Sequence, residues 1–288
     1  DKFRNNLARD KHIVVYGRSK QGKTCLHKKC LDPDQYIVIQ CGGNSSVSQI
    51  YATVLKEAGA TVTVTKKKTT SGGLKLGVEF QASGSIPFVV KGKGTAKGEG
   101  EIKAESSEEF KYFEIYPSDP NDLIRTLDTM NFRKFIMLED FHYLSPGVQA
   151  QVAIDLKAFH EKSLTCCFII VGVWLEPNRL VLYNGDLAGR LIPVSADLWT
   201  DDELHEVISS GEDLLNISFA DEVREEIVQA AQGNVGLLQE TCYRVCERNR
   251  VFKTQSELQE VGSVEEVTVV MAELALEQAG RYQITGRL

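Results

Sequence analysis

A run of residues near the start of the chain has the types and the spacing of a phosphate-binding loop. Residues 17–24 read Gly17-Arg18-Ser19-Lys20-Gln21-Gly22-Lys23-Thr24, a complete G-x-x-x-x-G-K-[ST] motif. Its glycines let the backbone wrap closely around an anion, and the N–H groups of the loop and of the following helix point at phosphate oxygens. In such a loop Lys23 reaches the β- and γ-phosphates, and the Thr24 hydroxyl binds magnesium. The motif therefore predicts a site for ATP and Mg²⁺.

A second stretch that can do chemistry is an apolar run that ends in two carboxylates. Residues 135–140 read Phe135-Ile136-Met137-Leu138-Glu139-Asp140. One carboxylate would hold the magnesium shell, and the other would polarise the water that attacks the γ-phosphate. By position Glu139 takes the metal role and Asp140 the catalytic one, but the order is the reverse of the commoner Asp-Glu, so either can serve in either part. The predicted metal ligands are thus Thr24, Glu139 and Asp140, and the alternative is a strand that merely ends in solvated acids.

Polar and basic residues after the next apolar run, residues 166–173, are candidates for sensing the γ-phosphate. Asn178 is the candidate sensor, and Arg179 and Arg190 are candidate catalytic arginine fingers. The planar guanidinium fork matches the charge that spreads over the phosphoryl oxygens in the transition state. Each arginine could equally form a surface salt bridge. The predicted nucleotide-contacting residues are Gly17, Ser19, Lys20, Gln21, Gly22, Lys23, Thr24, Cys25 and Asn178.

The elements that must position these residues alternate between apolar runs and helical patterns. A buried strand is predicted at 12–16 and a helix at 24–30, and further strands are predicted at 36–41, 110–116, 135–140, 166–173 and 191–194. This alternation predicts an α/β protein with a parallel sheet. From Trp199 onward the strands stop, and helices are predicted at 201–209, 221–231, 235–246 and 265–279. The predicted domains are a core at 1–198, a helical lid at 199–250 and, at 251–288, a helical extension or the start of a following domain.

Residues 61–105 interrupt the core with a different composition. Leu74, Leu76, Val78 and Phe80 alternate with polar residues, which predicts a β-hairpin insertion. The segment is basic in an acidic chain, because it contains Lys66, Lys67, Lys68, Lys75, Lys91, Lys93 and Lys97. It could follow a nucleic-acid backbone or dock on an acidic neighbouring subunit. The alternative is a solvated edge whose lysines prevent strand-to-strand aggregation.

Composition places the chain among soluble globular proteins. It has 288 residues, 42% hydrophobic residues and a net charge of −7, with no apolar stretch long enough to cross a bilayer and no secretory leader. The 7 cysteines show no C-x-x-C pair and no metal-ligand spacing, so they predict neither a disulfide framework nor a zinc site. We expect a cytoplasmic protein without a membrane partner. The chain begins at Asp1, which is consistent with a segment of a longer polypeptide, and the effector would be either a further domain or a partner protein outside this chain.

These motifs together resemble those of the AAA+ and STAND P-loop ATPases, in particular bacterial branches near the origin-recognition and transposon target-selection ATPases. The resemblance covers about Lys11 to Arg248 without 61–105, and includes Gly189-Arg190 before the last strand. It implies a three-layer fold whose parallel sheet has the strand order 5-1-4-3-2, with a helical lid that closes over ATP. The chain departs from the family at 233–238, where many members carry a sensor arginine or a Gly-x-Pro turn and this sequence has neither. The nearest lid arginine is Arg244.

The resemblance implies a magnesium-dependent ATPase switch that forms homo-oligomers and so controls an effector elsewhere, for example in bacterial defence against phage. An alternative is a DNA-binding loader or target selector that uses the basic segment from Lys66 to Lys97. A third reading, a small-molecule kinase, would be expected to lack the helical lid.

Overall fold

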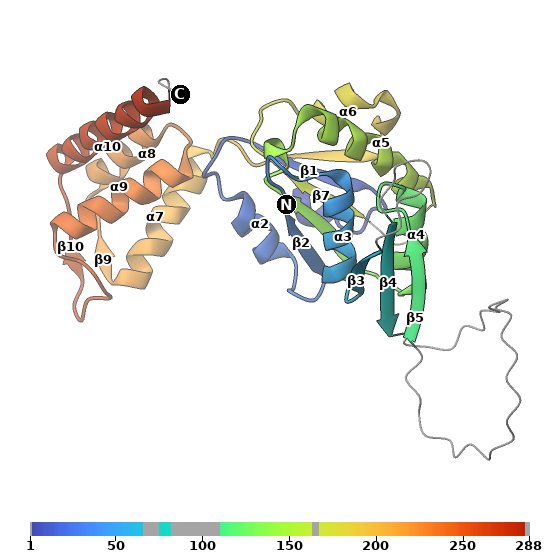
Figure 1. Ribbon diagram of the computed structural model, residues 1–288. Helices are drawn as coiled ribbons and strands as arrows, with labels where there is room; N and C mark the ends of the chain where they lie inside the picture. The colour runs from blue at the N-terminus through green and yellow to red at the C-terminus, as the bar shows by residue number, and fades with distance from the viewer. Residues whose placement is uncertain (1, 66–74, 82–109, 163–166, 286–288) are drawn as a thin grey trace, which may run out of the picture. The chain divides into compact units, whose positions relative to one another are not determined.

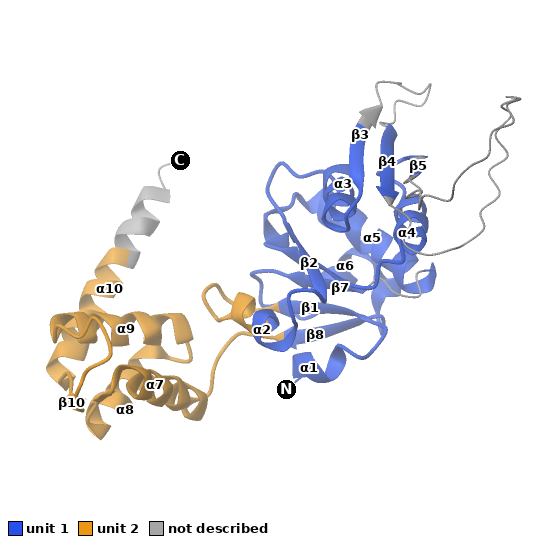
Figure 2. Cartoon of the chain, turned by 90° about the horizontal axis from the view of Figure 1, so that it is seen from below, with its two compact units in different colours: residues 1–15, 27–194 blue, residues 16–26, 195–288 orange. Residues whose placement is uncertain are grey.

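We analysed the chain in a computed structural model that describes residues 2–65, 75–81, 110–162 and 167–285 (Figure 1). The chain forms two compact units (Figure 2). The first unit comprises residues 1–15 and 27–194, and the second comprises residues 16–26 and 195–288. The phosphate-loop motif therefore belongs to the same unit as the C-terminal helices.

The first unit is built on a five-stranded sheet with the order β2-β6-β7-β1-β8. The strands are β1 (His12–Tyr16), β2 (Tyr36–Gln40), β6 (Phe135–Glu139), β7 (Phe168–Val171) and β8 (Leu191–Ser195). The pairs β1–β7, β6–β7 and β2–β6 are parallel. The predicted order numbers only the strands of this sheet, whereas the labels also count the three inserted strands β3, β4 and β5. When the five strands of this sheet are numbered 1 to 5 along the chain, their order from β8 to β2 is 5-1-4-3-2. The predicted α/β class is confirmed.

Burial explains why these runs form these strands. All four residues of β7 are buried, and so are the first four of β1, because helices and neighbouring strands cover them on every side. The edge strands β2 and β8 instead alternate between more and less buried residues, as expected for strands with one face toward the core. The continuous apolar runs of the sequence thus mark the centre of the sheet.

Helices flank the sheet, and local capping signals fix where several of them begin (Figure 2). They are α1 (Lys2–Asn6), α2 (Lys23–Cys30), α3 (Val47–Glu57), α4 (Pro120–Thr129), α5 (Pro146–Lys162) and α6 (Arg179–Tyr183). Ser46 and Gln49 form a capping box at the start of α3. Asp119 caps α4, with Pro120 as its first residue. Both helices therefore begin at residues that satisfy the free N–H groups of the first turn or do not need them.

The insertion is a three-stranded antiparallel sheet with the order β3-β4-β5, which corrects one prediction. Its strands are β3 (Thr61–Thr65), β4 (Lys75–Gln81) and β5 (Phe110–Ile115). The β3–β4 pair is the predicted hairpin, but β5 pairs with β4 and does not join the core sheet, so assigning 110–116 to the core was wrong. The reason is visible in β5, where Tyr112 and Glu114 are exposed and Ile115 is buried, a pattern typical of a sheet with one covered face.

Most of the lysines that make the insertion basic lie outside the described residues. These are Lys66, Lys67, Lys68, Lys91, Lys93 and Lys97. Lys75 is described: its Nζ lies 3.3 Å from Glu114 Oε2 and 5.3 Å from the centre of the Tyr116 ring. Its charge is therefore already paired across the strands.

The second unit has its own core. Its helices are α7 (Asp201–Leu215), α8 (Asp221–Ala231), α9 (Val235–Arg248) and α10 (Val264–Thr285), with a two-residue parallel pair, β9 (Ile217–Ser218) and β10 (Gln259–Glu260). Leu204, Ile227, Leu238, Val245 and Val270 are among its fully buried side chains. Two predictions were wrong in detail, because this short strand pair follows Trp199 and α10 continues through Gly280. Within the described ranges, no helix combines the length and the apolar character that crossing a membrane requires.

Candidate functional site

The phosphate-loop motif follows β1 directly and leads into α2, the strand–loop–helix arrangement that the motif requires. Gly17, Lys20 and Gly22 all have positive φ angles, of 145°, 62° and 78°. A Cβ atom on Gly17 would lie 2.2 Å from the backbone oxygen of Ala196, so only glycine fits there. The side chains of Thr24 and Cys25, in the first turn of α2, are exposed. The loop therefore presents backbone N–H groups and a helix N-terminus, which suit an anionic ligand.

The ammonium group of Lys23 folds back over the loop. Its Nζ donates hydrogen bonds to the backbone oxygens of Gly17, at 3.0 Å, and of Arg18. Arg18 in turn donates from its backbone N–H to Asp197 Oδ1 at 3.0 Å, and its guanidinium pairs with Oδ2 at 3.3 Å. The loop thus carries a lysine whose present acceptors are carbonyls that phosphate oxygens, as stronger charged acceptors, can replace. These residues fit the triphosphate of a nucleotide.

The acidic strand end belongs to the first unit and is tied to its neighbours. Asp140 follows β6 with φ 54°, a left-handed conformation that is uncommon for a residue other than glycine. The amide of Gln40, the last residue of β2, donates a hydrogen bond to Asp140 Oδ2. Burial, followed by the nearby Asp140 charge, raises the pKa of the Cys41 thiol to about 12. The Asp140 carboxylate is therefore oriented by Gln40 and lies beside a thiol that stays protonated.

Two residues that contact these carboxylates were not predicted from the sequence. Besides Gln40, the buried ring of His27 on α2 lies with Nδ1 3.7 Å from Glu139 Oε1. His27 also packs edge-on against Tyr36, with ring centres 5.3 Å apart. A signal for His27 exists in the sequence, because it lies four residues after Lys23 and so on the same face of the helix. Gln40 could be found only from the strand register, which pairs it with Glu139.

The loop after β7 is organised by Trp174. A Cβ atom on Gly172 would lie 1.5 Å from the Trp174 ring, so the indole occupies the space that a side chain at 172 would need. The Arg179 guanidinium lies 5.6 Å from the centre of the same ring. The Trp174 Nε1 and Arg179 Nε atoms are buried without a hydrogen-bond partner among the described residues. Asn178 is exposed and makes no side-chain capping bond to α6.

Arg190 lies at the amino end of β8. The backbone N–H of His12 donates to Arg190 O at the start of both strands, and Ala196 donates to Tyr16 O at their ends, so β8 runs parallel to β1. Arg190 pairs with Glu161 at 2.9 Å, and its side chain is 30% exposed. Arg190 thus forms the surface salt bridge that was the alternative to a finger role, although its guanidinium remains partly exposed.

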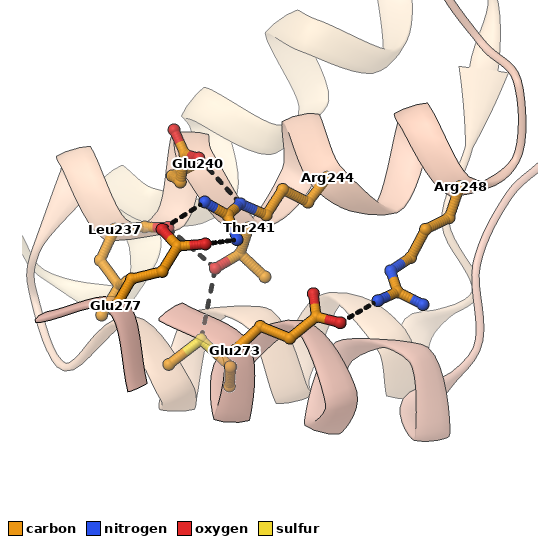
Figure 3. Close-up of polar contacts among 8 residues, drawn as sticks. Leu237, Glu240, Thr241, Arg244, Arg248, Glu273 and Glu277 are labelled. Carbon is orange, nitrogen blue, oxygen red and sulfur yellow. Dashed lines mark hydrogen bonds and ion pairs between the residues drawn. The ribbon is translucent and has the colours of Figure 1, made fainter. Parts of the chain in front are cut away.

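Arg244, the nearest arginine of the helical unit, is held between two helices (Figure 3). Its guanidinium forms a two-pronged pair with Glu277 on α10, at 2.8 Å for each contact, and a further contact with Glu240 at 2.9 Å. These carboxylates raise the pKa of Arg244 above its already high ordinary value, first through hydrogen bonding to Glu277. Arg244, Glu240 and Glu277 line a cavity of about 130 Å³ together with Lys20 and Gly236. Arg244 therefore stabilises the α9–α10 contact in this conformation.

Comparison with known proteins relates this chain to solved ATPase structures by fold. A Walker-type ATPase of Pyrococcus abyssi matches 99% of this chain and 74% of its own length, with a TM-score of 0.56 and 15% identity. The Orc1 protein of Aeropyrum pernix, solved in complex with DNA, matches 94% of this chain and 63% of its own length, with a TM-score of 0.50 and 13% identity. No protein-family description and no curated protein sequence matches the chain. At these identities the likeness shows only that the chain shares the fold of these two structures.

Proposed function

We propose that this protein is a magnesium-dependent ATPase that acts as a regulatory switch. One observation carries the proposal: β1 and β6 run parallel on either side of β7, so their carboxyl ends lie at one edge of the sheet. The phosphate-loop motif begins directly after β1, and the two carboxylates end β6. Ligands of open α/β sheets bind at this edge, and ATP hydrolysis needs both groups there.

Each residue has a role that follows from its chemistry. Lys23 and the loop N–H groups would bind the β- and γ-phosphates, and Thr24 with Glu139 would hold Mg²⁺. The ion, when bound, supplies positive charge that stabilises the charge developing on the phosphoryl oxygens. Asp140 would orient and deprotonate the attacking water, and Gln40 keeps that carboxylate in place. The ring of His27, on the helix that follows the loop, lies 3.7 Å from Glu139 and would help to orient that carboxylate.

The position of Arg190 supports assembly. Arg190 lies at the amino end of β8, whereas the phosphate loop follows the carboxyl end of β1. An arginine at this edge suits the nucleotide of a neighbouring copy, where its guanidinium would complete the site in trans. ATP binding would then favour a homo-oligomer, and hydrolysis would release it. The output would pass to an effector, and defence against phage is the form of output that we infer from the family resemblance.

The assembly step is tested by light scattering on the nucleotide-free protein and on the protein with Mg²⁺ and a non-hydrolysable ATP analogue. We expect a larger particle only with the analogue, and no assembly for Lys23→Ala. Arg190→Ala should bind the analogue but assemble weakly. A monomer under every condition, with the analogue bound normally, would contradict the switch.

A second candidate, a DNA-stimulated ATPase, is supported by the lysine content of the insertion, from Lys66 to Lys97. The Orc1 protein named above is a DNA-bound structure of the same fold. This candidate predicts DNA binding that weakens steeply with salt and ATP hydrolysis that rises with DNA. Replacing Lys66, Lys67 and Lys68 by glutamine should abolish both effects, and an unchanged response would rule this candidate out.

A further inference from the structure

Gln21, inside the phosphate loop, is buried against the start of α9 within the second unit. Its side chain is 2% exposed, and its Oε1 accepts a hydrogen bond of 3.4 Å from the backbone N–H of Val235, the first residue of α9. That N–H has no partner within its own helix, because it belongs to the first turn. The Nε2 atom of Gln21 is buried without a partner among the described residues. The loop therefore supplies an acceptor for the N-terminus of α9.

Trp199 lies against the same loop. Its indole Nε1 donates a 3.4 Å hydrogen bond to the backbone oxygen of Gln21, and its Cζ2 atom lies 3.6 Å from where a Cβ on Gly22 would be. Its own backbone N–H donates to Gly233 O at 3.0 Å, just before α9 begins. Trp199 thus joins the loop to the entry of α9 by side chain and backbone together.

Gly236, in the first turn of α9, allows the closest approach. A Cβ atom at this position would lie 2.7 Å from Lys20 Cβ and 2.8 Å from Lys20 O. Because the two backbones are this close, any movement of the loop at Lys20 meets the first turn of α9 directly. An arginine, which many members of the resembled family carry in this part of the lid, does not fit here while the loop holds this conformation.

We infer that Gln21, Trp199 and Gly236 form a direct mechanical link between the phosphate loop and α9, in place of a sensor arginine that reaches the nucleotide. The inference rests on the proposed function, because it describes how nucleotide binding at that site is transmitted to α9. When phosphates draw Lys23 away from the oxygens of Gly17 and Arg18, the loop backbone changes, and α9 follows through these contacts. Gln21 and Trp199 are positioning residues in this account.

The four helices of the second unit, α7 to α10, share one core and are expected to move with α9 as one body. Leu238 and Val245 of α9 are fully buried in the core of the unit. On the exposed side, Arg244 pairs with Glu277 and Arg248 pairs with Glu273 at 2.5 Å, which ties α9 to α10 along its length (Figure 3). Because a packed core does not deform continuously, a shift of the first turn of α9 carries the other helices with it.

The link can be tested with Trp199 itself as the reporter. The chain has 2 tryptophans, so Trp174→Phe leaves Trp199 as the only one. In this background we expect the binding of ADP with Mg²⁺, and of a non-hydrolysable ATP analogue with Mg²⁺, to shift the Trp199 emission. Hydrogen exchange at the amides of residues 235–237 should change in the same titration. Calorimetry on the same samples measures nucleotide binding independently.

Gly236→Ala is the decisive variant, and Gly211→Ala is its matched control. Gly211 lies in α7 of the same unit, and a Cβ there meets no atom within 4 Å. We expect Gly236→Ala to bind nucleotide and to lose the emission shift, and Gly211→Ala to keep both. Gln21→Met, which removes the acceptor without removing volume, should speed exchange of the Val235 amide in the nucleotide-free protein.

The outcomes separate this inference from the proposed function. Absence of nucleotide binding in the calorimeter would refute the proposed function. Binding without any change in Trp199 emission or in exchange at 235–237 would refute the link. A Gly236→Ala protein that keeps the full shift would refute it as well, and if that variant fails to fold, the exchange result for Gln21→Met decides.

Discussion

Acidification should destabilise the protein through His12, the first residue of the strand that carries the phosphate loop. The buried ring is 1% exposed; its Nε2 lies 2.9 Å from Leu156 O, and its Nδ1 accepts from the Phe168 N–H at 3.0 Å. These partners require the neutral form with its proton on Nε2. Burial, with a smaller contribution from the charge of His160, lowers the pKa of His12 from 6.5 to about 4.

The magnitude follows from linkage. Between pH 6.5 and about 4 the unfolded chain binds the proton and the folded protein does not, so the free energy of unfolding falls as pH falls through this window. At about pH 5 the loss is about 2 kcal/mol relative to neutral pH, and it approaches about 3 kcal/mol below the folded pKa, where it stops growing. Above the unfolded pKa the contribution of neutral His12 is fully present.

Urea unfolding at about pH 7.5 and about pH 5 measures this effect by comparison of variants. His12→Gln should be less stable than wild type at neutral pH, because the Phe168 N–H loses a well-placed acceptor. It should also lose about 2 kcal/mol less than wild type on acidification, since the titrating group is gone. His205→Gln, which removes an accessible histidine paired with Glu225, should keep the wild-type loss. Equal acid losses in wild type and His12→Gln would refute the reasoning.

Three further predictions concern the loop, the carboxylates and the helical unit. Gly17→Ala should lower the free energy of unfolding by about 3 kcal/mol in urea titrations, because its Cβ would approach the backbone oxygen after β8 to 2.2 Å at a positive φ. Gln40→Ala should lower kcat for ATP about tenfold with little change in KM, since it frees the Asp140 carboxylate and leaves the loop sequence unchanged. Arg224→Ala should cost about 2 kcal/mol of stability by thermal unfolding, because Glu212 is 6% exposed and lies 3.0 Å from that guanidinium. Adding Glu212→Leu should recover part of that loss.

The sheet could be predicted from the sequence because its central strands are continuous apolar runs between turn and helix signals. The sequence did not predict which sheet β5 joins. The residues of a core strand and of an insertion strand have similar β propensity, and what distinguishes β5 is that Tyr112 and Glu114 are exposed whereas Ile115 is buried. The end of α10 was missed for a different reason, since Gly280 is a common stop signal that a long helix can pass through.

The candidate site likewise contains residues that the sequence predicts and residues that only the structure reveals. The loop and the paired acids are contiguous in the sequence, so their chemistry can be read directly. His27, Gln40 and Trp199 act through contacts that depend on strand register and tertiary packing. The constraint at Gly236 is likewise visible only in the structure, where a Cβ atom would lie 2.7 Å from Lys20 Cβ.

The central claim is tested most directly by Mg²⁺-dependent release of phosphate from ATP. We expect activity in wild type, loss of at least about tenfold in Lys23→Ala and in Asp140→Asn, and full activity in Lys28→Ala, which removes an exposed lysine from the same helix. Removal of Mg²⁺ with EDTA should abolish the wild-type activity. ATP hydrolysis that survives in both Lys23→Ala and Asp140→Asn, or a purified wild-type protein that binds no ATP, would contradict the account.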